Sequence, residues 1–329
     1  MMIDETLLVV DYCYFLENES NSGSALYAIE IMVRYIAIQN TIFMENTGAD
    51  CVIGGMYTTF IFAYSNVTNN TIKAISFTKN SNLTLSACFF AFQQCSTSSK
   101  GCFITLTLNS IIIIYGAVVY DVVSESEGGF IYLESSNLTI VLLTVMQVLA
   151  TQGACVEGTK YSDVIIQNSS FQYYSPDCMY FSDSKIMMQN VNISDSIYEL
   201  ALMSNPDLMG ASVITMINCP LIVISQLQIN NNMGITDYGG ALFIQMQDLD
   251  NPMSIISDST FYANSAGQYG GAIYINNQNL TLLGNTFMNN NAQYGGAIYF
   301  DCQGNEIFFP PNLKFLNILH SQIVIILIM

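Results

Sequence analysis

The sequence predicts an all-β protein, a solenoid in which the chain winds into a right-handed parallel β-helix of about eleven coils. Two observations lead to this prediction. A glycine-containing motif followed by small and aliphatic residues recurs along the 329 residues, mostly at intervals of 24–31 residues. Between these motifs, short apolar runs alternate with polar corners, and no segment has the length or period of a crossover helix.

The clearest repeats lie near the C-terminus. There the sequence reads Tyr-Gly-Gly-Ala three times, with second glycines 31 and 25 residues apart, starting at Tyr238, Tyr269 and Tyr294. A second motif, Phe-x-x-Asn, starts at Phe15, Phe43, Phe261 and Phe287. Weaker copies of the first motif extend towards the N-terminus, and one copy near Lys73 has to be assumed.

These repeats define the predicted domain organisation. We assign residues 1–305 to one repeat domain, with the best-formed coils at residues 210–305. The segment Phe308-Phe309-Pro310-Pro311 then breaks the pattern. Residues 306–329 are therefore interpreted as an irregular tail or a truncated coil.

Residues at equivalent repeat positions fit the geometry of stacked coils. Glycine pairs allow a positive φ at a sharp corner, and corner asparagines can hydrogen-bond amide to amide along the rod. The aliphatic residues that follow the glycines are expected to face the core, namely Leu242, Ile273 and Ile298. The residues after them are expected to face outward, namely Phe243, Tyr274 and Tyr299.

The two motifs resemble the GGA[ILV] and FxxN repeats of the polymorphic outer-membrane proteins of chlamydiae and of large surface proteins of protists. The match is close at residues 239–242, 270–273 and 295–298 and degenerate elsewhere. The resemblance implies a pectin-lyase-like β-helix at a cell surface, often with an adhesive role. Neither a signal peptide nor a complete membrane-spanning segment is recognisable, and we expect the chain to be part of a longer protein.

Composition narrows the function further. Charged residues make up 10% of the chain and apolar residues 51%, with a mean hydropathy of +0.40, yet no run has the ~20 apolar residues of a membrane-spanning helix. The net charge of −18, with only seven basic residues, argues against binding to nucleic acid or acidic membranes. Eight Asn-x-Ser/Thr sequons favour a secretory route, at Asn18, Asn66, Asn69, Asn82, Asn137, Asn168, Asn192 and Asn279.

Residues suited to enzyme chemistry are scarce. His320 is the only histidine, Arg34 is the only arginine, and residues 210–298 contain no basic residue. Asp248 and Asp250 could form a carboxylate pair for glycoside hydrolysis, but they lie two residues apart in an expected loop. We predict that the chain is not an enzyme, and we assign no catalytic, cofactor-binding or metal-binding residue.

Two sets of residues have both a functional and a structural interpretation. The tyrosines before the glycine pairs could stack on sugars or on a partner protein, although stacking on one another is the commoner role. Four cysteines follow a corner, in the position that alanine occupies elsewhere, namely Cys51, Cys102, Cys155 and Cys178. Cys155 and Cys178 would lie on adjacent coils, where they form either a disulfide or a pair of small buried residues.

The sequence therefore predicts a non-catalytic β-helical module for structure, adhesion or recognition. We expect it to be extracellular or on a cell surface, membrane-associated within a larger protein, with glycans or surface proteins as partners. The alternative is a carbohydrate-active β-helix enzyme, a polysaccharide lyase or hydrolase, that lacks its basic catalytic residues. A third hypothesis is a truncated copy without independent function.

Overall fold

The computed structural model describes most of the chain in fourteen segments. They are residues 6–20, 25–29, 33–48, 51–95, 101–124, 127–175, 177–196, 212–232, 238–246, 254–276, 280–302, 307–308, 314–316 and 324–327. All secondary structure in these segments is β-strand, and every pairing between their strands is parallel. Within these segments no helix is long and apolar enough to cross a membrane.

One sheet contains 12 strands. In chain order they are β4 (Leu26–Ile29), β8 (Cys51–Met56), β11 (Lys73–Thr78), β14 (Ile104–Thr107), β17 (Ile131–Glu134), β20 (Val156–Thr159), β22 (Met179–Ser182), β24 (Ile214–Ile217), β26 (Leu242–Gln245), β29 (Ile273–Asn276), β32 (Ile298–Cys302) and β35 (Val324–Leu327). Each coil contributes one strand, so the count is close to the eleven coils predicted. The presence of β11 confirms the copy that had to be assumed near Lys73.

A second sheet contains 21 strands and receives one or two strands from each coil. They are β1 (Thr6–Asp11), β2 (Tyr14–Leu16), β5 (Val33–Gln39), β6 (Ile42–Met44), β9 (Thr59–Ala63), β10 (Asn66–Thr68), β12 (Asn82–Ser86), β13 (Phe89–Cys95), β15 (Ile111–Tyr115), β16 (Val118–Ser124), β18 (Asn137–Val141), β19 (Thr144–Leu149), β21 (Asp163–Ser175), β23 (Lys185–Ser194), β25 (Leu221–Asn230), β27 (Ser254–Ser257), β28 (Thr260–Tyr262), β30 (Leu280–Leu283), β31 (Thr286–Met288), β33 (Ile307–Phe308) and β34 (Lys314–Leu316). Two short strands, β3 (Glu19–Ser20) and β7 (Thr47–Gly48), pair separately.

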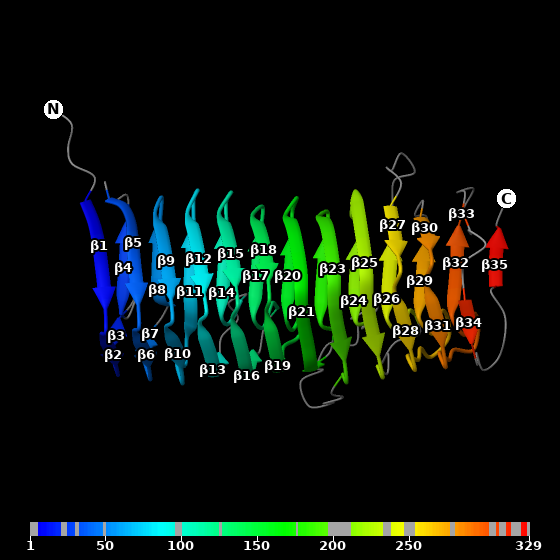
Figure 1. Ribbon diagram of the computed structural model, residues 1–329, viewed down its shortest axis with the longest axis horizontal. Helices are drawn as coiled ribbons and strands as arrows, with labels where there is room; N and C mark the ends of the chain where they lie inside the picture. Colours follow the sequence, from blue (N-terminus) through cyan, green and yellow to red (C-terminus); the bar gives the residue numbers. More distant parts are fainter. Residues whose placement is uncertain are drawn as a thin grey trace.

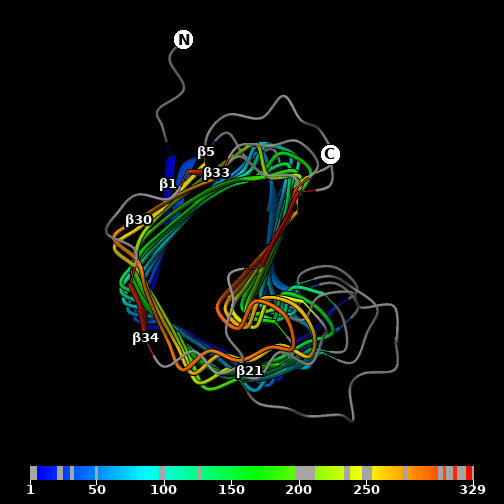
Figure 2. The same cartoon turned by 90° about the vertical axis from the view of Figure 1, so that its right-hand side faces the viewer.

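The coils stack into a rod. Figure 1 shows the strands of successive coils side by side along the long axis, with the two ends of the chain at opposite ends of the rod. In the end view of Figure 2 the 21-stranded sheet forms a curved wall, and the 12-stranded sheet closes the outline on the facing side. Successive coils pair in parallel at a spacing of about 4.8 Å, as the repeat pattern predicted.

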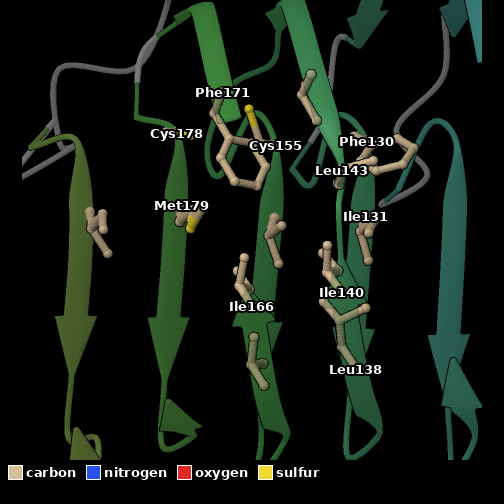
Figure 3. Packing of buried hydrophobic residues seen from close by; sticks show 14 of the residues in the cluster. Phe130, Ile131, Leu138, Ile140, Leu143, Cys155, Ile166, Phe171, Cys178 and Met179 are labelled. Carbon is tan, nitrogen blue, oxygen red and sulfur yellow. The ribbon is translucent and has the colours of Figure 1, made fainter. Parts of the chain in front are cut away.

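The core fills the space between the two sheets. Figure 3 shows Ile131 and Met179 of the 12-stranded sheet packing towards Ile140 and Ile166 of the 21-stranded sheet. The aliphatic residues predicted to face inward, Leu242, Ile273 and Ile298, are fully buried in this core. The inward positions alternate along each strand because successive side chains point to opposite faces of a sheet.

The residues predicted to face outward form a second, smaller core. Phe243, Tyr274 and Tyr299 do lie outside the main core, but they are almost completely buried. Tyr238 and Tyr269 from the preceding corners fold over them and cover the rings. The predicted orientation of these side chains, away from the main core, is thus confirmed. The sequence did not indicate that other tyrosine rings bury them.

The asparagines of the Phe-x-x-Asn motif form buried amide ladders inside the rod. Asn264 donates from Nδ2 to Asn290 Oδ1 at 3.1 Å and to the Ile229 carbonyl oxygen at 2.9 Å. Near the N-terminus, Asn46 makes the equivalent bond to Asn70 Oδ1 at 3.0 Å. The predicted stacking of amides between coils is confirmed. These bonds satisfy polar groups that would otherwise be costly to bury.

The two glycines of each pair have different structural roles. Gly270, the first of its pair, has a φ of +67°, the left-handed region that glycine adopts without strain. Gly271, the second, packs so closely on the next coil that an added Cβ would overlap the Gly296 carbonyl oxygen. Each position therefore requires glycine for a different reason.

The described residues beyond residue 306 continue the coil. Strands β33, β34 and β35 pair in parallel with β30, β31 and β32 of the preceding coil. The interpretation of residues 306–329 as an irregular tail or a truncated coil stays a prediction. The domain boundary at residue 305 stays a prediction, and residues 309–311 of the Phe-Phe-Pro-Pro segment lie outside the described residues.

Candidate functional site

A sharp corner recurs in the 21-stranded sheet over eleven successive coils, between two strands or, in β21, β23 and β25, within one strand, and it presents a row of side chains to solvent. The corner residue has a positive φ, which turns the chain between one strand and the next. In the first six coils this residue is, in order, Tyr12, Asn40, Tyr64, Ala87, Gly116 and Leu142. Backbone bonds from each corner to the coil that follows hold the row in register, such as Tyr64 N to Ser86 O at 3.0 Å.

This corner carries a large exposed apolar surface over the first six coils. We call it the corner patch, and it consists of Tyr12, Tyr14, Tyr64, Phe89, Tyr115, Val118 and Leu142. Tyr12, Tyr14 and Tyr64 are the most exposed, at 75%, 69% and 67%. Exposed apolar groups gathered in this way mark sites of interaction in soluble proteins, whereas single exposed rings need no explanation.

Over the next four coils the corner residue is polar, and in the fifth it is glycine. These residues are Asn168, Asn190, Gln226, Asp258 and Gly284. Asn190 Nδ2 donates to Asn168 Oδ1 at 2.8 Å, so the amides pair along the rod. The change from rings to amides occurs on one continuous backbone, and the fold itself therefore does not demand the aromatic side chains.

The surroundings of the corner patch are uncharged or acidic. The patch itself contains no charged residue. Between Tyr12 and Tyr64 in the corner row lies Asn40, whose Nδ2 donates to Asp11 Oδ1 at 3.0 Å. Aromatic faces and fixed amide groups thus lie side by side.

The tyrosines singled out from the sequence form a stacked row elsewhere, beside the 12-stranded sheet. Tyr238, Tyr269 and Tyr294 stack with ring centroids 5.4 Å apart. Tyr269 also lies 4.6 Å from Tyr299 in the row beneath. Most ring faces are therefore occupied by other rings. This geometry agrees with the interpretation in which the rings stabilise consecutive coils.

The four cysteines occupy two different positions. Cys155 and Cys178 share the predicted alanine position on adjacent coils, joined by a Cys155 N to Cys178 O bond of 2.8 Å, and both are buried free thiols. Cys51 and Cys102 lie one residue before the alanine position of their coils. Cys51 pairs with Lys73, and Cys102 aligns with Gly129, the second glycine of its pair. Cys102 is disulfide-bonded.

Acidic residues that the sequence did not single out lie in the middle of the rod. Asp177 is buried, its Oδ1 accepts a bond from Gly153 N at 2.8 Å, and burial raises the pKa of its carboxyl group to about 7. Glu157 is buried on the outer face of β20, next to Tyr180 of β22 in register. Asp177 occupies the position of a corner glycine, which is the signal that could have identified it.

Several residues considered for chemistry lie outside the described part of the chain. They are Asp248, Asp250 and His320, together with the side chain of Arg34. Among the residues that the structure does describe, no three potential metal ligands cluster together.

Comparisons with known proteins concern the fold. The family described as "Right handed beta helix region" matches residues 128–311, more than half of the chain. No curated protein matches. Among solved structures the chain is similar to the catalytic domain of a GH87 α-1,3-glucanase in complex with nigerose, with a TM-score of 0.36 and 10% identity. The similarity covers 95% of this chain and 64% of that one.

The solved structure corrects one prediction. The scarcity of basic residues led us to predict that the chain is not an enzyme, but the matched structure is itself a glycoside hydrolase catalytic domain. At this level of similarity the match assigns no activity to this chain.

Proposed function

Because the chain belongs to the right-handed β-helix family, we propose that it is a recognition module whose corner patch binds a neutral glycan. We place it outside the cell or on a cell surface, in line with the resemblance of its repeats to those of chlamydial and protist surface proteins. The observation that carries the proposal is the corner patch itself, in which exposed tyrosine, phenylalanine and aliphatic side chains gather over the first six coils, whereas the corner residue is polar in the next four.

The corner patch suits the two-sided chemistry of a sugar. A tyrosine ring offers an apolar face to the C–H face of a pyranose, and its hydroxyl remains free to hydrogen-bond. Tyr12 and Tyr64 lie in one row two coils apart, a separation of about 10 Å at the spacing of parallel strands. A rigid row of rings with an amide between them is suited to an extended polysaccharide, because little side-chain entropy is lost on binding.

Charge argues for a neutral glycan. With 25 acidic and seven basic residues the chain repels anionic polysaccharides such as polyuronates. Recognition of uronates also requires basic partners for carboxylates, and the corner patch contains none.

The proposal is tested by affinity electrophoresis of the full chain in gels that contain neutral or anionic polysaccharides. We expect retardation by at least one neutral polysaccharide and none by polyuronate. The double variant Tyr12→Ala/Tyr64→Ala should weaken the binding at least tenfold, which corresponds to about 1.4 kcal/mol. The matched control is Tyr161→Ala, because Tyr161 is 82% exposed but lies in the turn after β20, away from the corner patch.

Two results would overturn the proposal. One is the absence of retardation by every neutral polysaccharide in the set. The other is an equal loss of binding in Tyr161→Ala and in the double variant, which would show that exposed tyrosines act without regard to position.

A second candidate, a carbohydrate-active enzyme, is favoured by Asp177. A carboxyl group with a pKa of about 7 is half-protonated at neutral pH, as a general acid requires, but Asp177 is only 3% exposed and would have to become accessible before it could protonate a substrate. Release of reducing ends from a polysaccharide by the full chain, lost in Asp177→Asn and retained in Asp163→Asn, would support this candidate. No release, with Asp177→Asn still folded, would leave Asp177 a structural residue.

A further inference from the structure

We propose that Asn82 and Asn137 carry N-linked glycans that shield an exposed isoleucine strip on the 21-stranded sheet. We call Ile111 and Ile113 of β15 the isoleucine strip; they are 41% and 44% exposed. The inference goes beyond the proposed function and does not depend on glycan binding at the corner patch. It shares with that proposal only the passage of the chain through a secretory compartment.

Strand register places the isoleucine strip between two sequons. Asn82 of β12 pairs with Ile111, and Ile111 pairs with Asn137 of β18. Two residues further along the same strands, Ile113 lies between the threonines of those sequons, Thr84 and Thr139. Because residues two apart share a face of a strand, both asparagines, both threonines and both isoleucines point outward together.

The two asparagines are also free to be modified. Asn82 and Asn137 are exposed, and their neighbours towards the core, Leu83 and Leu138, are buried. A glycan on either amide would therefore extend into solvent without displacing the core. Asn66 shares this arrangement, with Val67 buried beneath it, whereas Asn18 does not.

Asn18 is the internal contrast. Its Nδ2 donates to Asn46 Oδ1 at 2.8 Å, and its backbone N–H donates to the same oxygen at 3.1 Å. A glycan on Nδ2 would break the first amide of the ladder. The fold therefore separates sequons that can hold a glycan from one that holds the coils together.

A shield is needed here for a physical reason. Only 10% of the residues are charged, so the outer wall has few charges to keep it soluble. A parallel sheet with adjacent exposed isoleucines is a surface on which two rods can associate. A glycan on each side of the isoleucine strip covers it without any change in the coil.

The modification is a group transfer from a lipid-pyrophosphate-linked oligosaccharide. A bond forms between Asn Nδ2 and the anomeric carbon of the first sugar, and the bond from that carbon to the pyrophosphate oxygen breaks. One Nδ2 proton is released, and the lipid pyrophosphate leaves with the electron pair. The hydroxyl of the sequon threonine is the feature that the transferase of the secretory route requires.

The test uses the full chain behind a cleavable secretion signal in a eukaryotic host. Medium and membrane fractions are both digested with peptide-N-glycosidase and mapped by mass spectrometry, and cleavage of the signal shows that the chain was translocated. We expect glycans on Asn82 and Asn137 and none on Asn18. Asn82→Gln and Asn137→Gln should each remove one glycan, whereas Asn80→Gln, a neighbouring asparagine outside any sequon, should remove none.

The outcomes separate the two proposals. Translocated chain without glycans on Asn82 and Asn137 overturns this inference and leaves the corner patch untouched. A glycan on Asn66, which pairs with Phe89 of the corner patch, would count against the proposed function but not against this inference.

Shielding has its own readout. The double variant Asn82→Gln/Asn137→Gln should aggregate faster in light scattering than the glycosylated chain. Adding Ile111→Thr and Ile113→Thr should restore solubility, because the apolar strip is then removed. If the double variant stays as soluble as the glycosylated chain, the shielding role is refuted.

Discussion

Two regions of the rod carry different side chains on the same backbone plan: the C-terminal coils, residues 238–300, and the middle coils, residues 101–194. At one outward position of the 12-stranded sheet the C-terminal coils hold Tyr274, stacked 5.7 Å from the next ring. In the same row the middle coils hold Thr105, Tyr132, Glu157 and Tyr180, so only two of the four carry an aromatic ring. The backbone therefore does not require an aromatic residue there.

The buried ladder position shows the same difference. Asn264 and its neighbours bond amide to amide in the C-terminal coils, whereas the middle coils place Val148 and Tyr174 in that row. Tyr174 Oη donates to Asn232 Oδ1 at 2.7 Å and so terminates the ladder. What both regions keep is the alternation of buried apolar residues and the positive-φ corners. Those two features specify the coil, and the repeated side chains add stacking and hydrogen bonds to it.

The largest expected effect comes from the second glycine of a pair. In Gly271→Ala the new Cβ would overlap the Gly296 carbonyl oxygen and lie 2.6 Å from the Asn291 carbonyl carbon. We expect a loss of about 4 kcal/mol in the free energy of unfolding, measured by urea denaturation. The comparison is Ala154→Gly in the middle coils, where the same row already holds alanine, with an expected loss of about 1 kcal/mol. Equal losses would show that the two regions are packed alike.

The amide ladder comes next. Asn264→Ala removes the acceptor of Asn232 and leaves the Ile229 carbonyl oxygen without its donor. We expect a loss of about 3 kcal/mol in urea denaturation, because buried polar groups lose their partners. Asn291→Ala, an exposed neighbour outside the ladder, should cost less than about 0.5 kcal/mol. A cost for Asn264→Ala as small as that of the control would mean that the ladder does not stabilise the coils.

The free energy of unfolding should depend on pH because of Asp177 in the middle coils. Burial raises its pKa to about 7, so the folded state binds a proton that the unfolded chain, with a pKa near 3.8, has released. The stability that depends on this group is then highest in acid, falls as the pH rises from about 4 to 7 and levels off above 7, with a loss of about 3 kcal/mol between pH 5 and pH 8. Asp177→Asn should flatten this slope. Asp163→Asn, which leaves Asp177 in place, should retain the pH dependence of the free energy of unfolding. If that dependence survives in Asp177→Asn, it originates at another group.

The comparison explains which features of the fold and of the candidate site could be predicted from the sequence. The Tyr-Gly-Gly-Ala and Phe-x-x-Asn copies predicted the coil, its period and the inward aliphatic residues, since these depend on patterns that recur. The corner patch was not predicted, because Tyr12, Tyr64 and Tyr115 share no motif and meet only through register. Asp177 was missed for a related reason: it departs from the repeat, and its burial depends on neighbouring coils rather than on local sequence.

The smallest effect tests whether the middle coils can accept a C-terminal residue. Cys178 occupies the alanine position, and its thiol is buried beside Cys155. Cys178→Ala should cost only about 1 kcal/mol in urea denaturation, because one buried sulfur atom is lost and the remaining space is small. Thiol titration of the denatured wild-type chain should count Cys155 and Cys178 as free. A loss of about 3 kcal/mol together with two missing thiols would instead indicate a disulfide between adjacent coils, and the two regions would then differ in covalent structure as well as in packing.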